Sequence, residues 1–392
     1  MKQRLDGLAV FRELLKDGAV AAFRELLQDC CRNDADNFVS HCGEFESLLF
    51  QQSDCWTAYL RRAVMESENV CIRNWASGAV TAVQEECLNR ELVFLDRLSQ
   101  VTLDDLTAGL DHAPDFLVGW RTEGGSIAQD YRQRMQEVGE KGYGIFARYH
   151  MFTVENGQLV PVKHPDPQQL EQLPGYEQER QKVIANTQAL LDGKPANNVL
   201  LYGDAGTGKS SAIKAIANNF AEQGLRLVEV KKNQLYQIPD LMDALAANPL
   251  KFILFIDDLS FTSNDDNFAA LKAILEGSVG GRAQNIAVYA TSNRRHLIKE
   301  TMTDRNGDDI HESDTRQELM SLSARFGLTV TFASPDRDRY LYIVGELAKQ
   351  YGVDLDEHTL AVRSEAFAIR MGGRSARVAK QFIELCKSGV QV

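Results

Sequence analysis

The sequence has no long apolar run and no apolar segment behind its first residues. None of its hydrophobic stretches approaches the 18 or more residues that a membrane-spanning helix needs. Residues 1–6, Met-Lys-Gln-Arg-Leu-Asp, lack the apolar core and the cleavage site of a secretion signal. We therefore expect a cytoplasmic protein with no membrane partner.

The chain also lacks paired cysteines and an excess of basic residues. Its seven cysteines include no C-x-x-C pair, and their spacings do not suit a zinc site, so we expect buried thiols instead. The net charge is −12, divided as −8 over residues 1–165 and −4 over residues 166–392. Neither part has the net charge of a basic nucleic-acid-binding surface. These net charges do not exclude a local basic patch on the folded surface.

One stretch matches the G-x-x-x-x-G-K-[ST] phosphate-binding loop. A strand-like run (198–202) precedes it and a helix-like segment (211–220) follows, which is the context that this motif requires. Glycines let the backbone turn its N–H groups toward a phosphate, and the helix N-terminus adds positive potential. We expect Lys209 to reach the β- and γ-phosphates and the Ser210 hydroxyl to bind Mg²⁺; the competing interpretation is a glycine-rich surface turn. The nucleotide-binding residues predicted here are Gly203, Asp204, Ala205, Gly206, Thr207, Gly208, Lys209, Ser210 and Ser211.

The hydrophobic pattern divides the chain into four parts. Residues 1–142 keep the helical period and carry no catalytic motif, which favours a helical adaptor or regulatory domain with Trp56, Trp75 and Trp120 in its core. Residues 143–165 predict a β-hairpin around Asn156-Gly157 and a proline-bearing linker. Residues 166–334 alternate short apolar runs with helical segments, which predicts an α/β nucleotide-binding domain with a mostly parallel sheet. Residues 335–392 show helical patterns only, and we expect a small helical lid.

Two further apolar runs end in polar residues that suit a nucleotide site. The run 252–256 ends in Asp257 and Asp258. We expect Asp257 to hold Mg²⁺, largely through water, and Asp258 to orient or deprotonate the attacking water; alternatively, the two aspartates only start a turn. The run 286–291 is followed by Ser292 and by Asn293, which is a candidate to hydrogen-bond the γ-phosphate or the lytic water.

Four arginines are candidates for contact with phosphate or with a neighbouring subunit. Arg325 lies at a helix-to-strand corner, where its planar guanidinium can neutralise charge on a transferring phosphoryl group, or cap its own corner instead. Arg377 lies at the start of the last helical segment, from which it can reach the nucleotide. Arg294 and Arg295 either touch a neighbouring subunit or begin a solvated helix.

Taken in order, these motifs resemble an AAA+ ATPase module. The resemblance covers about residues 166–392 and includes the phosphate loop, the Asp-Asp strand, a Thr-Ser-Asn segment (291–293), a Ser-Ala-Arg-Phe-Gly corner (323–327) and the lid arginine. The strand and the corner are similar to those of bacterial replication initiators and helicase loaders. The strings at 197–203, 289–297 and 322–328 resemble a bacterial AAA+ family catalogued only as a domain of unknown function, in which a helical region also precedes the ATPase.

The resemblance implies a role for each matching residue. Gly175 and Tyr176 match the segment that lies against the adenine. Arg325 matches the arginine finger that is given to the next subunit, and Arg377 matches the second sensor, with the nearby Arg374 as a competing choice.

The resemblance also implies roles for the phosphate loop and for the residues at the strand ends. The loop and Asp257 match the phosphate and Mg²⁺ site, and Asn293 matches the first sensor. Asp258 takes the place of the usual catalytic glutamate; because aspartate is one methylene shorter, we expect slow turnover.

The leading interpretation is an ATP-binding AAA+ protein that uses ATP and Mg²⁺. It would be a slow ATPase that couples nucleotide state to head-to-tail assembly of identical subunits and to an unknown protein partner of the N-terminal domain. The alternative is an ATP-controlled nucleic-acid-binding switch of the initiator or helicase-loader type, against which the acidic N-terminal part weighs. A third interpretation is a scaffold that binds ATP to hold its shape and does not hydrolyse it.

Overall fold

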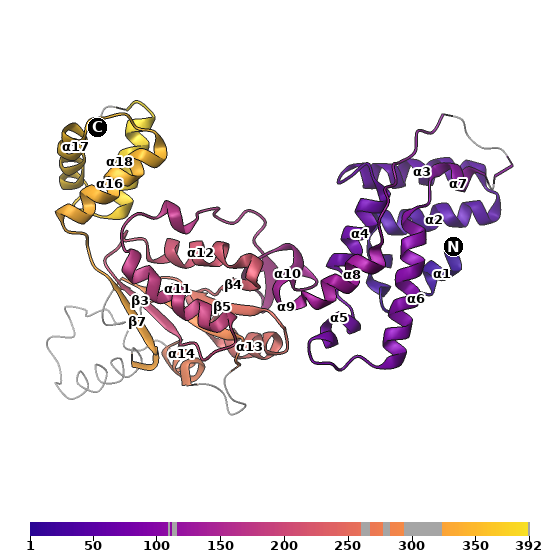
Figure 1. Cartoon of the computed structure of the whole chain (residues 1–392), viewed down its shortest axis with the longest axis horizontal. Coiled ribbons are helices and arrows are strands. Elements are labelled where there is room, and N and C mark those ends of the chain that lie inside the picture. The colour runs from indigo at the N-terminus through magenta and orange to yellow at the C-terminus, as the bar shows by residue number, and fades with distance from the viewer. Residues whose placement is uncertain (109, 112–115, 260–266, 277–282, 294–323, 391–392) are drawn as a thin grey trace. The chain divides into compact units, whose positions relative to one another are not determined.

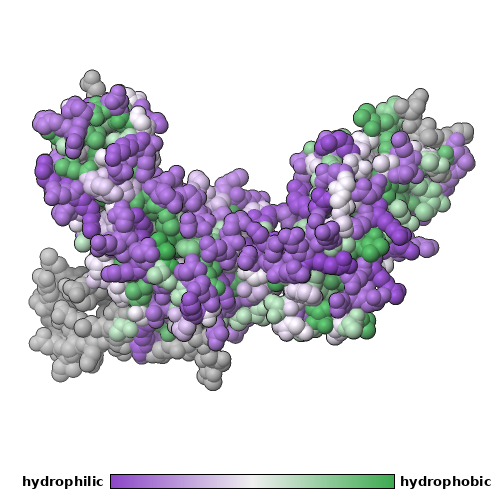
Figure 2. Space-filling model, in the orientation of Figure 1, coloured by the Kyte–Doolittle hydropathy of each residue, from purple (hydrophilic) through white to green (hydrophobic). Residues whose placement is uncertain are grey.

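The computed structural model describes residues 1–108, 110–111, 116–259, 267–276, 283–293 and 324–390 (Figure 1). Its packing divides the chain into two compact units, Met1–Arg148 and Tyr149–Val392. No helix in the described ranges is both long enough and apolar enough to cross a membrane. On the face shown in Figure 2, hydrophilic residues predominate over both units.

The first unit is helical and has its own aromatic core. Phe23 stacks on Trp56 with the ring centroids 4.7 Å apart, and Phe45 meets both rings edge-on or nearly so. Trp120 meets Phe23 and Phe45 in the same way. Trp56 and Trp120 are core anchors as predicted. The prediction for Trp75 is wrong, because this residue ends a short helix and is 37% exposed. The described helices of this unit are α1 (Lys2–Asp6), η1 (Arg12–Lys16), α2 (Gly18–Arg32), α3 (Ala35–Phe50), α4 (Trp56–Glu66), α5 (Val70–Trp75), α6 (Ala82–Ser99), α7 (Leu103–Thr107), α8 (Ile127–Gln136), α9 (Val138–Lys141) and α10 (Ile145–Arg148).

The thiols of the chain are all free. Cys42, Cys55 and Cys71 are buried, as the sequence predicts, and burial raises the pKa of Cys42 to about 12. The prediction of a buried thiol is wrong for Cys31, which is exposed. The described residues contain no group of three or more His, Cys, Asp or Glu side chains that could hold a metal ion.

The second unit is an α/β domain built on one sheet. The sheet has seven described strands in the order β2-β1-β4-β5-β6-β3-β7, and every neighbouring pair is parallel except β1 and β2. The inner strands are continuous apolar runs because helices cover both faces of such a sheet; all seven residues of β6 are buried. The fold class predicted from the sequence is thus confirmed. The strands are β1 (Met151–Glu155), β2 (Gln158–Pro161), β3 (Val199–Gly203), β4 (Leu225–Glu229), β5 (Lys251–Ile256), β6 (Ile286–Ser292) and β7 (Leu328–Phe332).

The predicted hairpin forms one edge of this sheet. Asn156 and Gly157 both have positive φ, at 49° and 77°, which suits the two-residue turn between β1 and β2. The hairpin starts later than the sequence suggests, because residues 145–148 form α10 instead of strand. The remaining helices of the sheet domain are η2 (Leu170–Gln172), α11 (Glu177–Leu191), α12 (Lys209–Asn219), η3 (Ala221–Gln223), η4 (Lys232–Gln237), α13 (Ile238–Ala246) and α14 (Asn267–Glu276).

Three helices follow β7, in the segment where the sequence predicts a helical lid. They are α16 (Arg337–Tyr351), α17 (Glu357–Arg370) and α18 (Ala376–Lys387). Each begins at a side-chain cap, from Asp336, Asp356 and Ser375 respectively, that accepts a hydrogen bond from a backbone N–H in the first turn. These caps explain why the helical starts could be located from the sequence to within two residues.

Candidate functional site

The phosphate-binding sequence forms a loop between β3 and α12, and two of its glycines are sterically required. Gly203 has φ 138°, and a Cβ there would lie 2.0 Å from the carbonyl oxygen of Phe332 on β7. Gly206 has φ 78°, and its Cβ would lie 3.1 Å from the Cβ of Arg377 and from Oγ of Ser375. The loop therefore packs closely on the sheet on one side and on the start of α18 on the other.

Lys209 begins α12 and points back over the loop. Its ammonium donates hydrogen bonds to the carbonyl oxygens of Gly203 (2.9 Å) and Asp204 (2.7 Å) and to Oδ1 of Asn293 (3.0 Å). The residue is only 6% exposed, and this burial lowers the pKa of its ammonium, while nearby carboxylates act in the opposite direction. Lys209 and Asn293 are 84 positions apart in the chain, yet they lie side by side as the sequence predicts for two ligands of one phosphate.

A hydroxyl and carboxylate cluster lies beside the lysine. The Ser210 hydroxyl donates to Oδ1 of Asp257 at 2.6 Å, and the Thr291 hydroxyl donates to the same oxygen at 2.5 Å. Hydroxyl and carboxylate oxygens are the ligands that Mg²⁺ prefers, and this ion usually keeps water and phosphate oxygens as its other ligands. The pair of Ser210 and Asp257 therefore fits Mg²⁺ bound together with a nucleotide.

Asp258 lies next to this cluster in a conformation unusual for a residue with a side chain. Its φ is 50°, and its N–H donates to Oγ1 of Thr291 (2.9 Å) and to Oδ1 of Asp257 (3.1 Å). The Nδ2 group of Asn293 donates to Oδ1 of Asp258 at 2.8 Å. Asn293 thus joins the lysine to the second aspartate, and the exposed Asp258 lines the same cavity.

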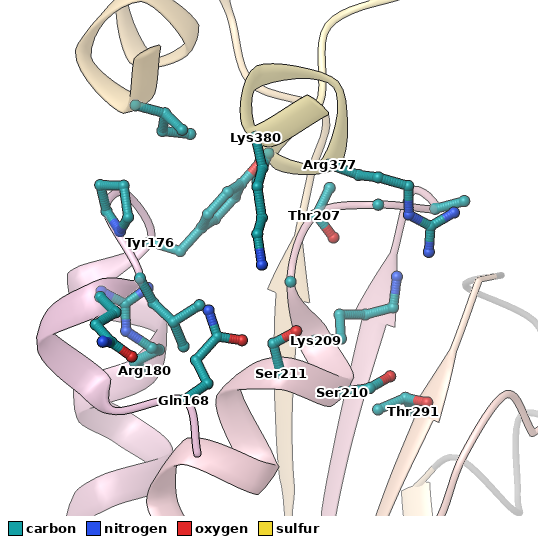
Figure 3. A pocket seen from close by; sticks show the side chains of 18 of the residues that line it. Gln168, Tyr176, Arg180, Thr207, Lys209, Ser210, Ser211, Thr291, Arg377 and Lys380 are labelled. Atoms are coloured by element: carbon teal, nitrogen blue, oxygen red, sulfur yellow. The ribbon is translucent and has the colours of Figure 1, made fainter. Parts of the chain in front are cut away.

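The lid contributes Arg377 to this space and directs Arg374 elsewhere. The N–H of Arg377 donates to the carbonyl oxygen of Gly206 at 3.0 Å, which fixes the first turn of α18 on the phosphate loop. Figure 3 shows the guanidinium of Arg377 reaching toward the ammonium of Lys209. Arg374 instead forms a bidentate ion pair with Glu365 of α17, at 2.9 and 2.6 Å. Of the two arginines, the geometry favours Arg377 as the nucleotide contact.

The other end of the site is an apolar slot. Gly175 and Tyr176 both have positive φ, and a Cβ at Gly175 would lie 2.9 Å from Ile343 of the lid. The Tyr176 ring stacks on Phe332, and its hydroxyl donates to the carbonyl oxygen of Ala333 at 2.6 Å. The Tyr176 side chain is therefore held in the core. It lines the cavity together with the apolar residues Leu173, Pro174, Ile343 and Leu347, and the polar residues Gln168, Gln172 and Arg180 line the cavity as well.

These groups line a single cavity of about 470 Å³ (Figure 3). Its lining runs from Asp257, Asp258 and Asn293 at one end, along Ala205 to Ser211, to the apolar slot at the other. A cavity that combines a loop of N–H groups, oxygen ligands and apolar side chains has the kinds of groups that a phosphate-bearing ligand with an aromatic base would contact.

Not every predicted residue lies in this cavity. Asp204 turns its carboxylate to Ser334, whose N–H and hydroxyl both donate at 2.8 Å and lower the pKa of the carboxyl. Arg325 is half-buried in the corner before β7 and is not among the described residues that line the cavity. Gly327 in the same corner packs on Asn197, because a Cβ would lie 2.3 Å from Oδ1 of that residue. Arg294 and Arg295 lie outside the described residues.

Sequence reasoning missed several residues of the site. Thr291 lies in the Thr-Ser-Asn segment, but its role is not predicted from the sequence. In the structure, its hydroxyl donates to the carboxylate of Asp257 and accepts from the N–H of Asp258. Lys380 lines the cavity three residues after Arg377, and this spacing on one helix face was the available signal. Gln168, Leu173 and Pro174 carry no motif and line the cavity through tertiary packing alone.

Comparison with known proteins identifies the C-terminal part of the chain. Residues 146–390 match the family described as "Protein of unknown function (DUF815)", which confirms the family predicted from the sequence. Comparison with curated proteins gave no significant match. Among solved structures, the chain is similar to the FIGL-1 AAA domain in complex with ADP, with 18% identity, a TM-score of 0.39, and coverage of 55% of this chain and 72% of that one.

Proposed function

We propose that this chain, which belongs to the DUF815 family, is an ATP-binding AAA+ protein and a slow Mg²⁺-dependent ATPase. The observation that carries the proposal is the convergence of Lys209, Ser210, Asp257, Asn293 and Arg377 on one cavity. These residues come from the phosphate loop, from the ends of two neighbouring strands and from the lid. A surface turn rich in glycine would not gather a buried lysine, an oxygen ligand pair and a lid arginine around the same space.

Each group has a chemical task in this proposal. The loop N–H groups, Lys209 and Arg377 neutralise the negative charge of the phosphates. Ser210 and Asp257 supply oxygen ligands to Mg²⁺, which when bound neutralises charge that develops between the β- and γ-phosphates. Asp258 accepts the proton of the attacking water or orients it, and Asn293 holds that carboxylate in place through its 2.8 Å hydrogen bond.

The remaining parts of the proposal concern assembly and partners. Arg325 lies outside the cavity of its own chain, which supports a role at the cavity of a neighbouring copy in a head-to-tail oligomer. The N-terminal unit has a hydrophobic core of its own, which supports a separate task such as binding a partner protein. In this proposal, residues 1–142 form the partner-binding domain, 143–165 the hairpin and linker, 166–334 the ATPase domain and 335–392 the lid.

The nucleotide part is tested by replacing Lys209 with methionine. Loss of a buried charge that contacts phosphates directly is expected to weaken ATP binding by about 100-fold, since charge-assisted hydrogen bonds contribute about 1.5–3 kcal/mol each. The matched control is Lys214→Met on the same helix, a lysine paired with Glu229 at 3.4 Å, which is expected to leave binding unchanged. Titration with a fluorescent ATP analogue measures both. Unchanged affinity and turnover in the Lys209 variant would refute the proposal.

Turnover and assembly are tested by phosphate release at rising protein concentration. A site shared between subunits gains specific activity as subunits associate, and Arg325→Ala is expected to abolish this gain without changing ATP affinity at low concentration. A constant specific activity in both proteins contradicts the shared site. Tight binding with no phosphate release at any concentration contradicts the ATPase and leaves a nucleotide-binding scaffold.

A further inference from the structure

The last helix of the lid carries two cations that line the nucleotide cavity. Arg377 and Lys380 are three residues apart on α18, so both side chains leave the same face of the helix. The backbone of Arg377 is tied to Gly206 by a 3.0 Å hydrogen bond, which fixes the direction of that face over the phosphate loop. The position of Lys380 over the cavity is therefore set by the fold of the lid and by this contact with the loop.

The two cations point to different parts of the cavity. Figure 3 shows Arg377 reaching toward the ammonium of Lys209, and its positive charge is one of the influences that lower the pKa of that lysine. Lys380 extends on the other side of the loop toward Ser211 and Gln168 (Figure 3). The cavity therefore has one lid cation at the end that holds the metal ligands and a second between the loop and the apolar slot.

The ammonium of Lys380 has donor capacity for a ligand. Its ion pair in the described structure is with Glu384, one turn further along α18, at 3.9 Å. Both side chains are about half exposed, at 47% and 48%, and a pair of this length in water contributes little. A phosphate oxygen that enters the cavity therefore competes with a weak partner only.

We propose that Lys380 binds the α-phosphate of the nucleotide and so holds ATP and ADP alike. This inference rests on the proposed nucleotide site and adds a binding residue to it. Lys380 extends toward Ser211, the last residue of the phosphate-loop segment in the lining (Figure 3). In the proposed site, the loop before Ser211 receives the outer phosphates and the apolar slot receives the base. The anionic group that joins these two parts of a nucleotide is the α-phosphate. Arg377, at the opposite end, distinguishes ATP from ADP.

The experiment compares the Kd values of ATP and ADP for Lys380→Met, Lys380→Arg and the unaltered chain, by competition against a fluorescent ADP analogue. Lys380→Met is expected to raise both Kd values by the same factor, about tenfold, because one charge-assisted contact common to both ligands is lost. The increase is expected to be smaller at high salt, because salt screens a contact between two charges. Lys380→Arg keeps the charge and is expected to recover most of the affinity. Lys349→Met, an exposed lid lysine paired with Glu346 at 2.6 Å, is the control and is expected to change neither value.

The outcomes separate this inference from the proposed function. If the unaltered chain binds neither nucleotide, the proposed function fails and the inference with it. If the unaltered chain binds both and Lys380→Met matches it, the inference fails alone. A loss confined to ATP would place Lys380 at the γ-phosphate, and a loss independent of salt would place it on the uncharged ribose; either result overturns the assignment. Because the Lys380 side chain is 47% exposed and its ion pair with Glu384 is long, we expect the melting temperature of each variant to stay unchanged.

Discussion

Replacing Thr291 by valine tests whether one buried hydroxyl positions the metal-binding carboxylate. Thr291 is 2% exposed; its hydroxyl donates to Oδ1 of Asp257 at 2.5 Å and accepts from the N–H of Asp258 at 2.9 Å. Valine has the same shape and removes both hydrogen bonds. The carboxylate of Asp257 then keeps the hydroxyl of Ser210 and the N–H of Asp258 as partners, but loses the contact with the neighbouring strand.

The expected loss of stability is modest, and the expected loss of activity is specific. A hydrogen bond contributes about 0.5–1.5 kcal/mol to the free energy of unfolding. The bond to the Asp257 carboxylate contributes little more than a neutral one, because that carboxylate is exposed to solvent. We therefore expect Thr291→Val to lower the free energy of unfolding by about 1–2 kcal/mol in total. For a unit of this size that corresponds to a fall in melting temperature of about 2–8 °C. Because the carboxylate loses the hydroxyl of Thr291 and is held less firmly in position, we expect Mg²⁺-dependent turnover to fall by about tenfold, while nucleotide affinity without Mg²⁺ changes less than about twofold.

The control is a second buried threonine that is not among the residues lining the cavity. Thr187 in α11 is fully buried, donates to the carbonyl oxygen of Val183 and lies 2.9 Å from the hydroxyl of Tyr289. Thr187→Val is expected to lower the melting temperature by a similar amount and to leave the Mg²⁺ dependence unchanged. Thermal melting and a Mg²⁺ titration of phosphate release measure both variants. If Thr291→Val is destabilised but keeps the Mg²⁺ dependence of the unaltered chain, the proposed geometry of the metal site is wrong.

The remaining predictions concern the lid and the adenine segment. Arg377→Ala is expected to weaken ATP binding more than ADP binding. Arg374→Ala loses the ion pair with Glu365 and is expected to lower the melting temperature without changing either affinity. If both variants change the ratio of the Kd values for ATP and ADP equally, the assignment of Arg377 is wrong. Burial raises the pKa of Tyr176 to about 12, so the unfolded chain loses this proton near pH 10 while the folded chain keeps it. The contribution of Tyr176 to the free energy of unfolding is therefore fully present below pH 10 and is lost as the pH rises from 10 to about 12. Tyr176→Phe is expected to make this fall shallower in urea unfolding at a series of pH values, and an unchanged slope would show that the phenol is not buried in solution.

The sheet strands and lid helices could be predicted closely because their signals are local. The runs 252–256 and 286–291 are continuous and apolar, as strands covered on both faces require, and the structure extends each by only one residue. The lid helices begin after Asp and Ser caps and are amphipathic along their whole length. Propensity, capping and hydrophobic period agree in these segments, so no distant contact is needed to place them.

Breaks within the N-terminal helices could not be predicted from the same signals. The helical pattern continues from residue 45 to 65, but the structure ends α3 at Phe50 and begins α4 at Trp56. Between them, the N–H of Trp56 donates to the carbonyl oxygen of Arg121, and the N–H of Arg121 donates to that of Asp54. Backbone hydrogen bonds between segments about 66 residues apart therefore determine where the helix breaks. The hydrophobic pattern over a few helical turns contains no information about such a distant contact.

The convergence of the site residues follows from strand order and register, which are the parts that the sequence leaves undetermined. In the parallel pair β5 and β6, Ile256 lies opposite Ala290, so the next residues along, Asp257 and Thr291, are also neighbours. In the pair β3 and β6, Tyr202 lies opposite Ser292, which places Asn293 beside the start of the phosphate loop and within reach of Lys209. Polar residues one position past the ends of parallel strands therefore meet only if those strands are adjacent and in this register. The sequence indicates where each strand ends. Because β6 lies between β5 and β3, the ends of the three strands lie together and form one site.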